Sequence, residues 1–324
     1  MTEHERPLVA VLGASGFIGS VVTAALAERP IRLRAVVRTR SVVPSGGAAD
    51  LEVRTADLTD AGALEDAVDG ADAIVHLVAR TSGRREPGAE AAGERVNVGV
   101  MRDLLDVLRK RPDTGGLAPV VVYAGSTSQV GVPPRTRLDG TETDRPEIPF
   151  DRQKLAAERL LLEAGAAGVV RGVSLRLPTA FGHSPVTGAL DSGVLTFMTR
   201  RALAGEPITM WHDGTVQRDL LYVRDAVSAL VAALDHADAL AGRHWLVGTG
   251  VGSPLGEVFR TIAELAAERT GTEPVPVLSV EPPGTVSETD LRSVVIDAGA
   301  FRERTGWHPK ADLREALRAT VAVA

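Results

Sequence analysis

Cysteine is absent from the sequence, which excludes disulfide bonds, thiolate metal sites and cysteine nucleophiles. An excess of positive charge is also absent: 36 Lys and Arg stand against 42 Asp and Glu, a net charge of −6, so neither nucleic acid nor an anionic membrane is expected as a partner. No apolar run reaches the ~18 residues of a membrane span. The short polar N-terminus predicts no secretory signal and a cytoplasmic location, and no metal site is predicted.

Two side-chain types are so scarce that each occurrence is informative. The only tyrosines are Tyr123 and Tyr222, and only three of the 36 basic residues are lysines, at positions 110, 154 and 310. A lysine kept in a chain that otherwise uses arginine indicates a position where the two are not interchangeable. The remaining composition, 44% hydrophobic and 24% charged over 324 residues, is typical of a globular protein of about two domains.

Strand-like and helical segments alternate through the first half of the chain. This alternation predicts a Rossmann-type, doubly wound parallel sheet, an α/β fold. Strands are predicted at 8–12, 32–37, 51–54, 73–78, 120–123 and 173–177, and helices at 150–164 and 188–206. After Gly182 the alternation is less regular, so we expect a smaller C-terminal α/β domain over 183–218 and 250–324. The large domain then covers 1–182, with returns at about 219–249.

A glycine-rich loop follows the first predicted strand directly and leads into a helix. Glycines there allow a tight turn and a close approach of the backbone to a pyrophosphate, and the helix N-terminus offers free N–H groups. A glycine triplet alone is weak evidence, but strand, turn and helix in this order predict a dinucleotide-binding loop. The residues expected to contact the dinucleotide are Gly13, Ser15, Gly16, Phe17, Ile18 and Gly19.

The end of the second predicted strand indicates which dinucleotide binds. An acidic residue there would accept a hydrogen bond from the ribose 2′-OH of NAD, whereas arginine suits the 2′-phosphate of NADP. The sequence has Arg38 and Arg40 and no acidic residue at this point. We therefore predict NADP(H), with Arg38 as the first contact and Arg40 as the second. The alternative is an exposed basic loop in an arginine-rich chain.

Taken with further segments, these features resemble the extended short-chain dehydrogenase/reductase family, in its nucleotide-sugar branch, over essentially the whole chain. The segments are Asp57-Leu58, His76-Leu-Val-Ala79, Val96-Asn97-Val98, Arg218-Asp-Leu-Leu-Tyr-Val-Arg-Asp225 and Gly306-Trp-His-Pro309. The resemblance implies that the large domain binds NADP and the small one a nucleotide sugar. It also implies cofactor contacts by Asp57, Leu58, Leu77, Val78, Ala79, Asn97 and Pro178.

The same resemblance implies a substrate site. Arg218 corresponds to the arginine that binds the diphosphate of the nucleotide sugar, because a guanidinium fork matches phosphate oxygens; a structural Arg–Asp pair is the alternative. Thr179 aligns with a position that touches substrate, and His183 lies on the loop entering the small domain. Where the family has a further arginine, this chain has Glu288, and Arg292 is the candidate to replace it.

At finer grain, the segments 201–221 and 290–307 resemble actinobacterial deoxysugar 4-ketoreductases. Those enzymes reduce the C4 ketone of dTDP-4-keto-6-deoxyhexoses in antibiotic biosynthesis. The resemblance implies a dTDP-linked keto-deoxysugar as substrate. It also implies a homodimer, formed through the helices spanning about 91–110 and 150–164.

The family's chemistry uses a serine or threonine, a tyrosine and a lysine. Ser126 stands at the serine position with Thr127 beside it, and Lys154 stands at the lysine position. The tyrosine, which gives a proton to the carbonyl oxygen, is replaced by Phe150. Phe150 therefore belongs to the predicted catalytic slot but has no proton to give.

Three explanations for Phe150 stay open. An engineered exchange could trap a complex. Natural loss would leave proton delivery to Ser126, Thr127, a water held by Lys154 or a substrate hydroxyl, with His183 a further candidate acid. Loss of catalysis would leave a non-catalytic NADP-binding sensor. Among enzymes, a nucleotide-sugar 4-epimerase with tightly held NAD is the alternative, and the arginines after the second strand argue against it.

Overall fold

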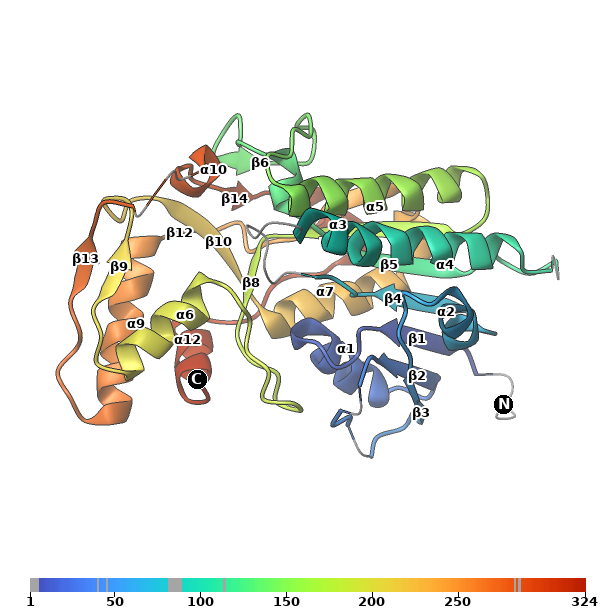
Figure 1. Cartoon of the computed structure of the whole chain (residues 1–324), viewed down its shortest axis with the longest axis horizontal. Helices are drawn as coiled ribbons and strands as arrows, with labels where there is room; N and C mark the ends of the chain where they lie inside the picture. The colour runs from blue at the N-terminus through green and yellow to red at the C-terminus, as the bar shows by residue number, and fades with distance from the viewer. Residues whose placement is uncertain are drawn as a thin grey trace.

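The computed structural model describes residues 6–39, 41–44, 46–80, 89–112, 115–282, 284 and 287–324. Its largest sheet has the strand order β11-β7-β5-β4-β1-β2-β3, and every neighbouring pair is parallel (Figure 1). The strands are β1 (Leu8–Leu12), β2 (Arg32–Val37), β3 (Asp50–Thr55), β4 (Ala73–His76), β5 (Val120–Ser126), β7 (Arg171–Leu177) and β11 (Arg243–Leu246). The order reverses between β1 and β4, and ligands of doubly wound sheets bind beyond the carboxyl ends of strands at such a point.

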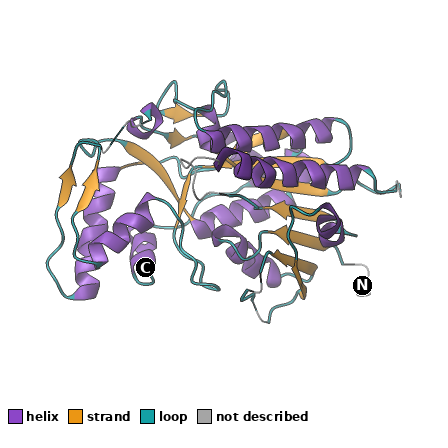
Figure 2. Cartoon of the chain, viewed as in Figure 1, coloured by secondary structure: helices purple, strands orange, loops and turns teal. Residues whose placement is uncertain are grey.

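Helices cover both faces of this sheet (Figure 2), which explains why the central strands β1, β4 and β5 are mostly apolar and buried. One face carries α2 (Ala61–Val68), α3 (Ala89–Glu94), α4 (Val100–Arg109) and α5 (Pro149–Ala166), and the other carries α1 (Phe17–Ala27), α7 (Val223–Asp235) and α8 (Ala237–Leu240). Alternate residues of β1 serve the two faces: Leu8, Ala10 and Leu12 belong to the core with α2, α4 and α5, and Val9 and Val11 to the core with α1 and α7.

The smaller C-terminal part is built from short strands and helices. Its strands are β8 (Thr179–Phe181), β10 (Gln217–Tyr222) and β12 (Gly252–Pro254) in one sheet, β9 (Ile208–Met210) with β13 (Val277–Ser279), and β6 (Arg137–Leu138) with β14 (Val295–Ile296). Its helices are α6 (Val194–Leu203), α9 (Leu255–Thr270), α10 (Glu288–Leu291), α11 (Gly299–Thr305) and α12 (Leu313–Val321). The predicted fold class is confirmed. The chain returns to the large sheet through α7 and β11, while β10 pairs in the small sheet.

The helix predicted over 188–206 is wrong at its start, because α6 begins only at Val194. Gly188 has a φ of +68°, a left-handed conformation that no right-handed helix contains. The Asp191 carboxylate then accepts hydrogen bonds from the Gly193 N–H (2.7 Å) and the Thr196 hydroxyl (2.6 Å). These local bonds organise the turn before the helix, so residues 188–193 form a loop.

Candidate active site

The glycine loop has the geometry of a phosphate cradle. Gly13 has a φ of +86°, which favours glycine, and a Cβ on Gly19 would lie 2.0 Å from the Gly13 carbonyl oxygen. Gly16 is the N-cap of α1 and has no side chain to cap the first N–H groups of that helix. Ser15, Phe17 and Ile18 are half-buried in this loop and the first turn. The loop residues therefore fit a pyrophosphate group at the helix start.

The residue after β2 lies close to the segment predicted to contact adenine. Arg38 is exposed. Hydrogen bonds from Thr59 lower the pKa of Asp57, and the positive charge of Arg38 lowers it further. Leu58 is buried. The structure thus brings Arg38 and Asp57 together, while Arg40 lies outside the described residues.

The segment after β4 is held from two sides. The Leu77 N–H donates to the Leu12 carbonyl at 3.0 Å, so Leu77 and Val78 run beside the glycine loop. On the other side, the buried Asn97 amide accepts from the Arg80 N–H at 2.7 Å. Asn97 lies in a π-helical turn, Arg95–Gly99, which divides α3 from α4. Such turns often occur at functional sites.

Lys154 lies in the core of the predicted catalytic slot and is only 6% exposed. Its Nζ donates to the Ala124 carbonyl at 2.6 Å and lies 4.5 Å from the centre of the Tyr123 ring and 6.0 Å from that of Phe150. Burial lowers the pKa of Lys154 to about 8, although the nearby Glu158 carboxylate opposes the shift. Phe150 and Lys154 stand one turn apart on α5.

Ser126 ends β5 and leads into the short 3-10 helix Thr127–Val130. Its N–H donates to the Gln129 side chain at 2.8 Å, which fixes the turn. The Ser126 hydroxyl lies 2.7 Å from the Ser128 hydroxyl, which donates to the Asp151 carboxylate at 2.6 Å. These bonds connect the end of β5, with Ser126 and Thr127, to the first turn of α5, with Phe150.

Neither tyrosine is positioned as an accessible acid. Tyr123 is 1% exposed, and burial raises its pKa, with the Glu158 charge raising it further. Tyr222 is buried with its ring centre 5.6 Å from that of Phe181. Both tyrosines are therefore core residues.

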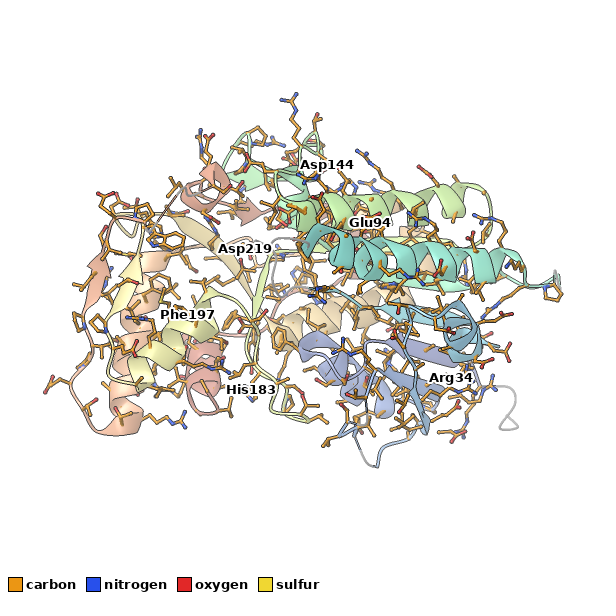
Figure 3. All side chains as sticks on the ribbon, in the orientation of Figure 1. Arg34, Glu94, Asp144, His183, Phe197 and Asp219 are labelled. Carbon is orange, nitrogen blue, oxygen red and sulfur yellow. The ribbon has the colours of Figure 1, made fainter. Side chains whose placement is uncertain are left out.

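The loop between β8 and α6 extends from the small part toward the dinucleotide loop. His183 is half-buried at its start (Figure 3). Burial lowers the pKa of His183, and the charge of Arg224 lowers it further, so the imidazole is neutral at pH 7. Further along the loop, the Thr187 hydroxyl lies 3.5 Å from the Ser20 hydroxyl of α1. Thr179 and Pro178, both half-buried, precede this loop.

Arg218 is held by main-chain carbonyl groups. Its guanidinium donates to the carbonyl oxygens of Thr289 (3.1 Å), Asp290 (2.8 Å) and Arg292. Burial lowers the pKa of Arg218. The Arg292 side chain is exposed and pairs with Glu288 at 2.6 Å. Both predicted phosphate-binding arginines thus meet at one turn, Arg218 through its side chain and Arg292 through its carbonyl group.

Sequence reasoning missed Ser128 and Asp151 as parts of this site. The signal for Asp151 was its place directly after Phe150, but its bond to Ser128 needs α5 to meet the end of β5. In the described part of the chain, no group of three His, Asp or Glu residues could hold a metal ion. Within the same residues, no helix has the length and apolar character needed to cross a membrane.

This fold and site define an α/β protein with a dinucleotide-type glycine loop, and comparisons with known proteins identify its family. Residues 9–248 match the model of the NAD dependent epimerase/dehydratase family, and the chain belongs to this family. The predicted membership of the extended short-chain dehydrogenase/reductase family, which typically uses NAD(P), is thereby confirmed.

The chain is similar to two dehydrogenases of known name. The chain is 28% identical over 320 residues to the dTDP-6-deoxy-L-talose 4-dehydrogenase (NAD(P)(+)) of Kitasatospora kifunensis, covering 97% of this chain and 95% of that one. It is 30% identical over 251 residues to the D-erythronate dehydrogenase of Cupriavidus necator, covering 74% and 75%. Among solved structures, MoeE5 in complex with UDP-glucose and NAD aligns with a TM-score of 0.79 at 28% identity, covering 98% of both chains.

Proposed function

We propose that this protein is an NADPH-dependent ketoreductase that acts on the C4 ketone of a dTDP-4-keto-6-deoxyhexose in deoxysugar biosynthesis. The observation that carries the proposal is the slot formed by Ser126, Phe150 and the buried Lys154 beside the carboxyl ends of the central strands. The full-length similarity to a dTDP-6-deoxy-L-talose 4-dehydrogenase supports a dTDP-sugar and carbon C4. The finer segments resembling deoxysugar 4-ketoreductases support reduction.

The nicotinamide cofactor, when bound, supplies or receives the hydride. We infer that the glycine loop holds its pyrophosphate, that Arg38 and Arg40 hold the 2′-phosphate, and that Asp57 and Leu58 contact the adenine. Lys154 holds the nicotinamide ribose. The other proposed cofactor contacts are Leu77, Val78, Ala79, Asn97 and Pro178.

On the substrate side, Arg218 would bind the diphosphate, with Thr179, His183 and Arg292 nearby. Arg218 now donates to neutral carbonyl oxygens. A diphosphate offers stronger acceptors, so the guanidinium would exchange them on binding. Ser126 would hydrogen-bond the ketone oxygen and stabilise the developing alkoxide.

The test is NADPH oxidation, followed by absorbance, with a dTDP-4-keto-6-deoxyhexose. We expect turnover, a preference for NADPH over NADH, and a reversed preference in Arg38→Asp. NADPH binding, followed by fluorescence, gives a readout independent of turnover. A 4-epimerase would instead convert the sugar without net NADPH oxidation. A sensor would bind NADPH and show no affinity for dTDP, and either result would reject the proposal.

A further inference from the structure

The proposed reduction needs a proton for the ketone oxygen, and Phe150 cannot give one. Lys154 directs one of its three N–H donors to the Ala124 carbonyl at 2.6 Å, and the proposed function assigns the others to the nicotinamide ribose. Both tyrosines are buried in the core. A different group has to exchange protons with the substrate oxygen.

A hydrogen-bonded chain of three side chains begins at the residue expected to contact that oxygen. The Ser126 and Ser128 hydroxyl oxygens lie 2.7 Å apart, and the Ser128 hydroxyl donates to the Asp151 Oδ1 at 2.6 Å. With Asp151 ionised, the proton of Ser128 is directed to Asp151, so Ser126 is the donor in the first bond, which is the polarity for taking up a proton from a substrate alcohol. Asp151 is only 6% exposed. The chain therefore leads from the slot to a buried carboxyl group adjacent in sequence to Phe150.

We propose that Ser126, Ser128 and Asp151 form a proton relay that takes the place of the tyrosine. The proposal rests on the proposed ketoreductase function. In it, Ser126 is the catalytic residue that touches the substrate oxygen, and Ser128 and Asp151 act through it.

The relay balances the reaction. As the carbonyl carbon gains the hydride, the π electron pair of the C=O bond moves to oxygen, which takes the proton of Ser126. Before this step Asp151 takes a proton from solvent and the two serine hydroxyls turn, so that Asp151 donates to Ser128 and Ser128 donates to Ser126. Ser126 then takes the proton of Ser128, and Ser128 takes the proton of the Asp151 carboxylic acid. Asp151 is left as a carboxylate and regains a proton from water. Alcohol oxidation runs along the same path in reverse and ends with the proton on Asp151.

Several groups were possible proton donors on the sequence alone, and the hydrogen-bonded chain favours Ser126 among them. Ser126 is connected to a group that can store a proton, and the connection is made by side chains that are fixed on two sides. Ser128 is held by its place in the 3-10 helix, and Asp151 by the first turn of α5. A fixed path is what general acid–base catalysis requires, since proton transfer depends on hydrogen-bond distance.

The experiment is a double-variant cycle of Asp151→Asn with Phe150→Tyr, measured with NADPH and a dTDP-4-keto-6-deoxyhexose. Asparagine keeps the shape and still accepts from Ser128 but cannot store a proton. With Phe150, we expect Asp151→Asn to lower kcat on the order of 100-fold, with KM nearly unchanged. With Tyr at position 150 a direct proton donor is present, so the Asp151→Asn exchange should lower kcat by less than about threefold.

Further variants and measurements separate a relay from a structural role. Asp66→Asn, on the exposed surface of α2, is the matched control and should leave kcat unchanged. NADPH affinity by fluorescence and thermal unfolding should be alike in all variants. Ser128→Ala should resemble Asp151→Asn, and Ser128→Thr, which keeps a hydroxyl, should recover much of the rate.

The relay is overturned if Asp151→Asn leaves kcat unchanged in the chain with Phe150. It is also overturned if Asp151→Asn lowers kcat by the same factor with Phe and with Tyr at position 150. It is also overturned if only the Phe150→Tyr protein is active, because the native chain then lacks a proton path. If no variant oxidises NADPH while all still bind it, the proposed ketoreductase function fails, and the relay fails with it.

Discussion

Single polar side chains at the site owe their charge states to burial. His76 is fully buried at the end of β4 beside Tyr123, with ring centres 5.5 Å apart. Burial and, to a smaller extent, the charge of Lys154 together lower the pKa of His76 from 6.5 to about 3. Lys154 itself has a pKa of about 8. At pH 7 His76 is therefore neutral, and of His76 and Lys154 only Lys154 carries a charge.

His76 should make the fold sensitive to acid. Its pKa is lower in the folded than in the unfolded chain, so the unfolded chain binds more protons between pH 6.5 and about 3. The resulting stability is complete above pH 6.5 and falls with decreasing pH. Relative to His76→Phe, the native chain should lose about 2 kcal/mol of unfolding free energy between pH 6.5 and 5. Urea unfolding at both pH values measures the free energy of unfolding of each chain. An equal change between the two pH values in the native chain and in His76→Phe would contradict the prediction.

Lys154 should give cofactor binding an alkaline limit. Its ammonium group loses its proton as pH rises through about 8. If this charge holds the nicotinamide ribose, the Kd for NADPH should rise about tenfold between pH 7 and pH 9. Fluorescence titration tests this, with Lys154→Met as the control, which should bind more weakly and with little dependence on pH. A constant Kd in the native chain would rule out the proposed contact.

At the scale of elements, an ionic cluster fixes α5 against the sheet. Arg176 of β7 forms ion pairs with Glu158 of α5 at 2.5 Å and with the Asp144 carboxylate at 2.7 Å. Ser174 donates to Glu158 at 2.6 Å. Glu158 is one turn beyond Lys154 on α5. The cluster therefore sets the position of α5, and with it those of Phe150, Asp151 and Lys154.

Breaking this cluster should be costly. Arg176→Met leaves the buried Glu158 and the largely buried Asp144 without their cation, and we expect a loss of about 3–5 kcal/mol in unfolding free energy. Arg314→Met is the control, because Arg314 pairs with Glu264 and Glu268 at the surface, where less than about 1 kcal/mol is expected. Denaturant unfolding compares them. Similar losses in the two variants would contradict the prediction.

The sequence predicted those elements whose signals are local. β1 and β2 have the predicted bounds, since their apolar runs and flanking turns lie within a few residues. β14 was not predicted, because it is two residues long and pairs with β6, over 150 positions earlier. The glycine loop could be predicted because its glycines, the preceding strand and the following helix are all neighbours in the sequence. The Ser128–Asp151 bond could not, because it joins two elements only through tertiary packing.

For the molecule as a whole, α4 and α5 lie side by side on one face (Figure 1). Between them is a shallow hollow lined by apolar Leu105, Leu160 and Ala164 and by charged Arg102, Asp106, Arg109 and Glu163. We propose that a second copy of the chain packs here to form the homodimer that the family resemblance implies. Apolar residues framed by both signs of charge suit a symmetric interface.

Leu160→Glu should convert the proposed dimer into a monomer, because it places a charge in the apolar centre of the interface. Light scattering after gel filtration gives the mass directly. Glu65→Gln, an exposed change on α2, should leave the mass unchanged. A native chain that elutes as a monomer would contradict the proposed assembly, and so would a Leu160→Glu protein that stays dimeric.

The apolar core of α6, α9 and α12 is continuous with the core between the large sheet and α1 and α7. The chain also crosses between the two parts repeatedly, from β7 to β8, from β10 to α7 and from β11 to β12. The smaller part is therefore not a module that recombination can exchange by one cut in a linker. A chimaera with new sugar specificity would need several junctions and matched packing across them, so specificity in this scaffold is more readily altered by substitutions within the loops than by domain swapping.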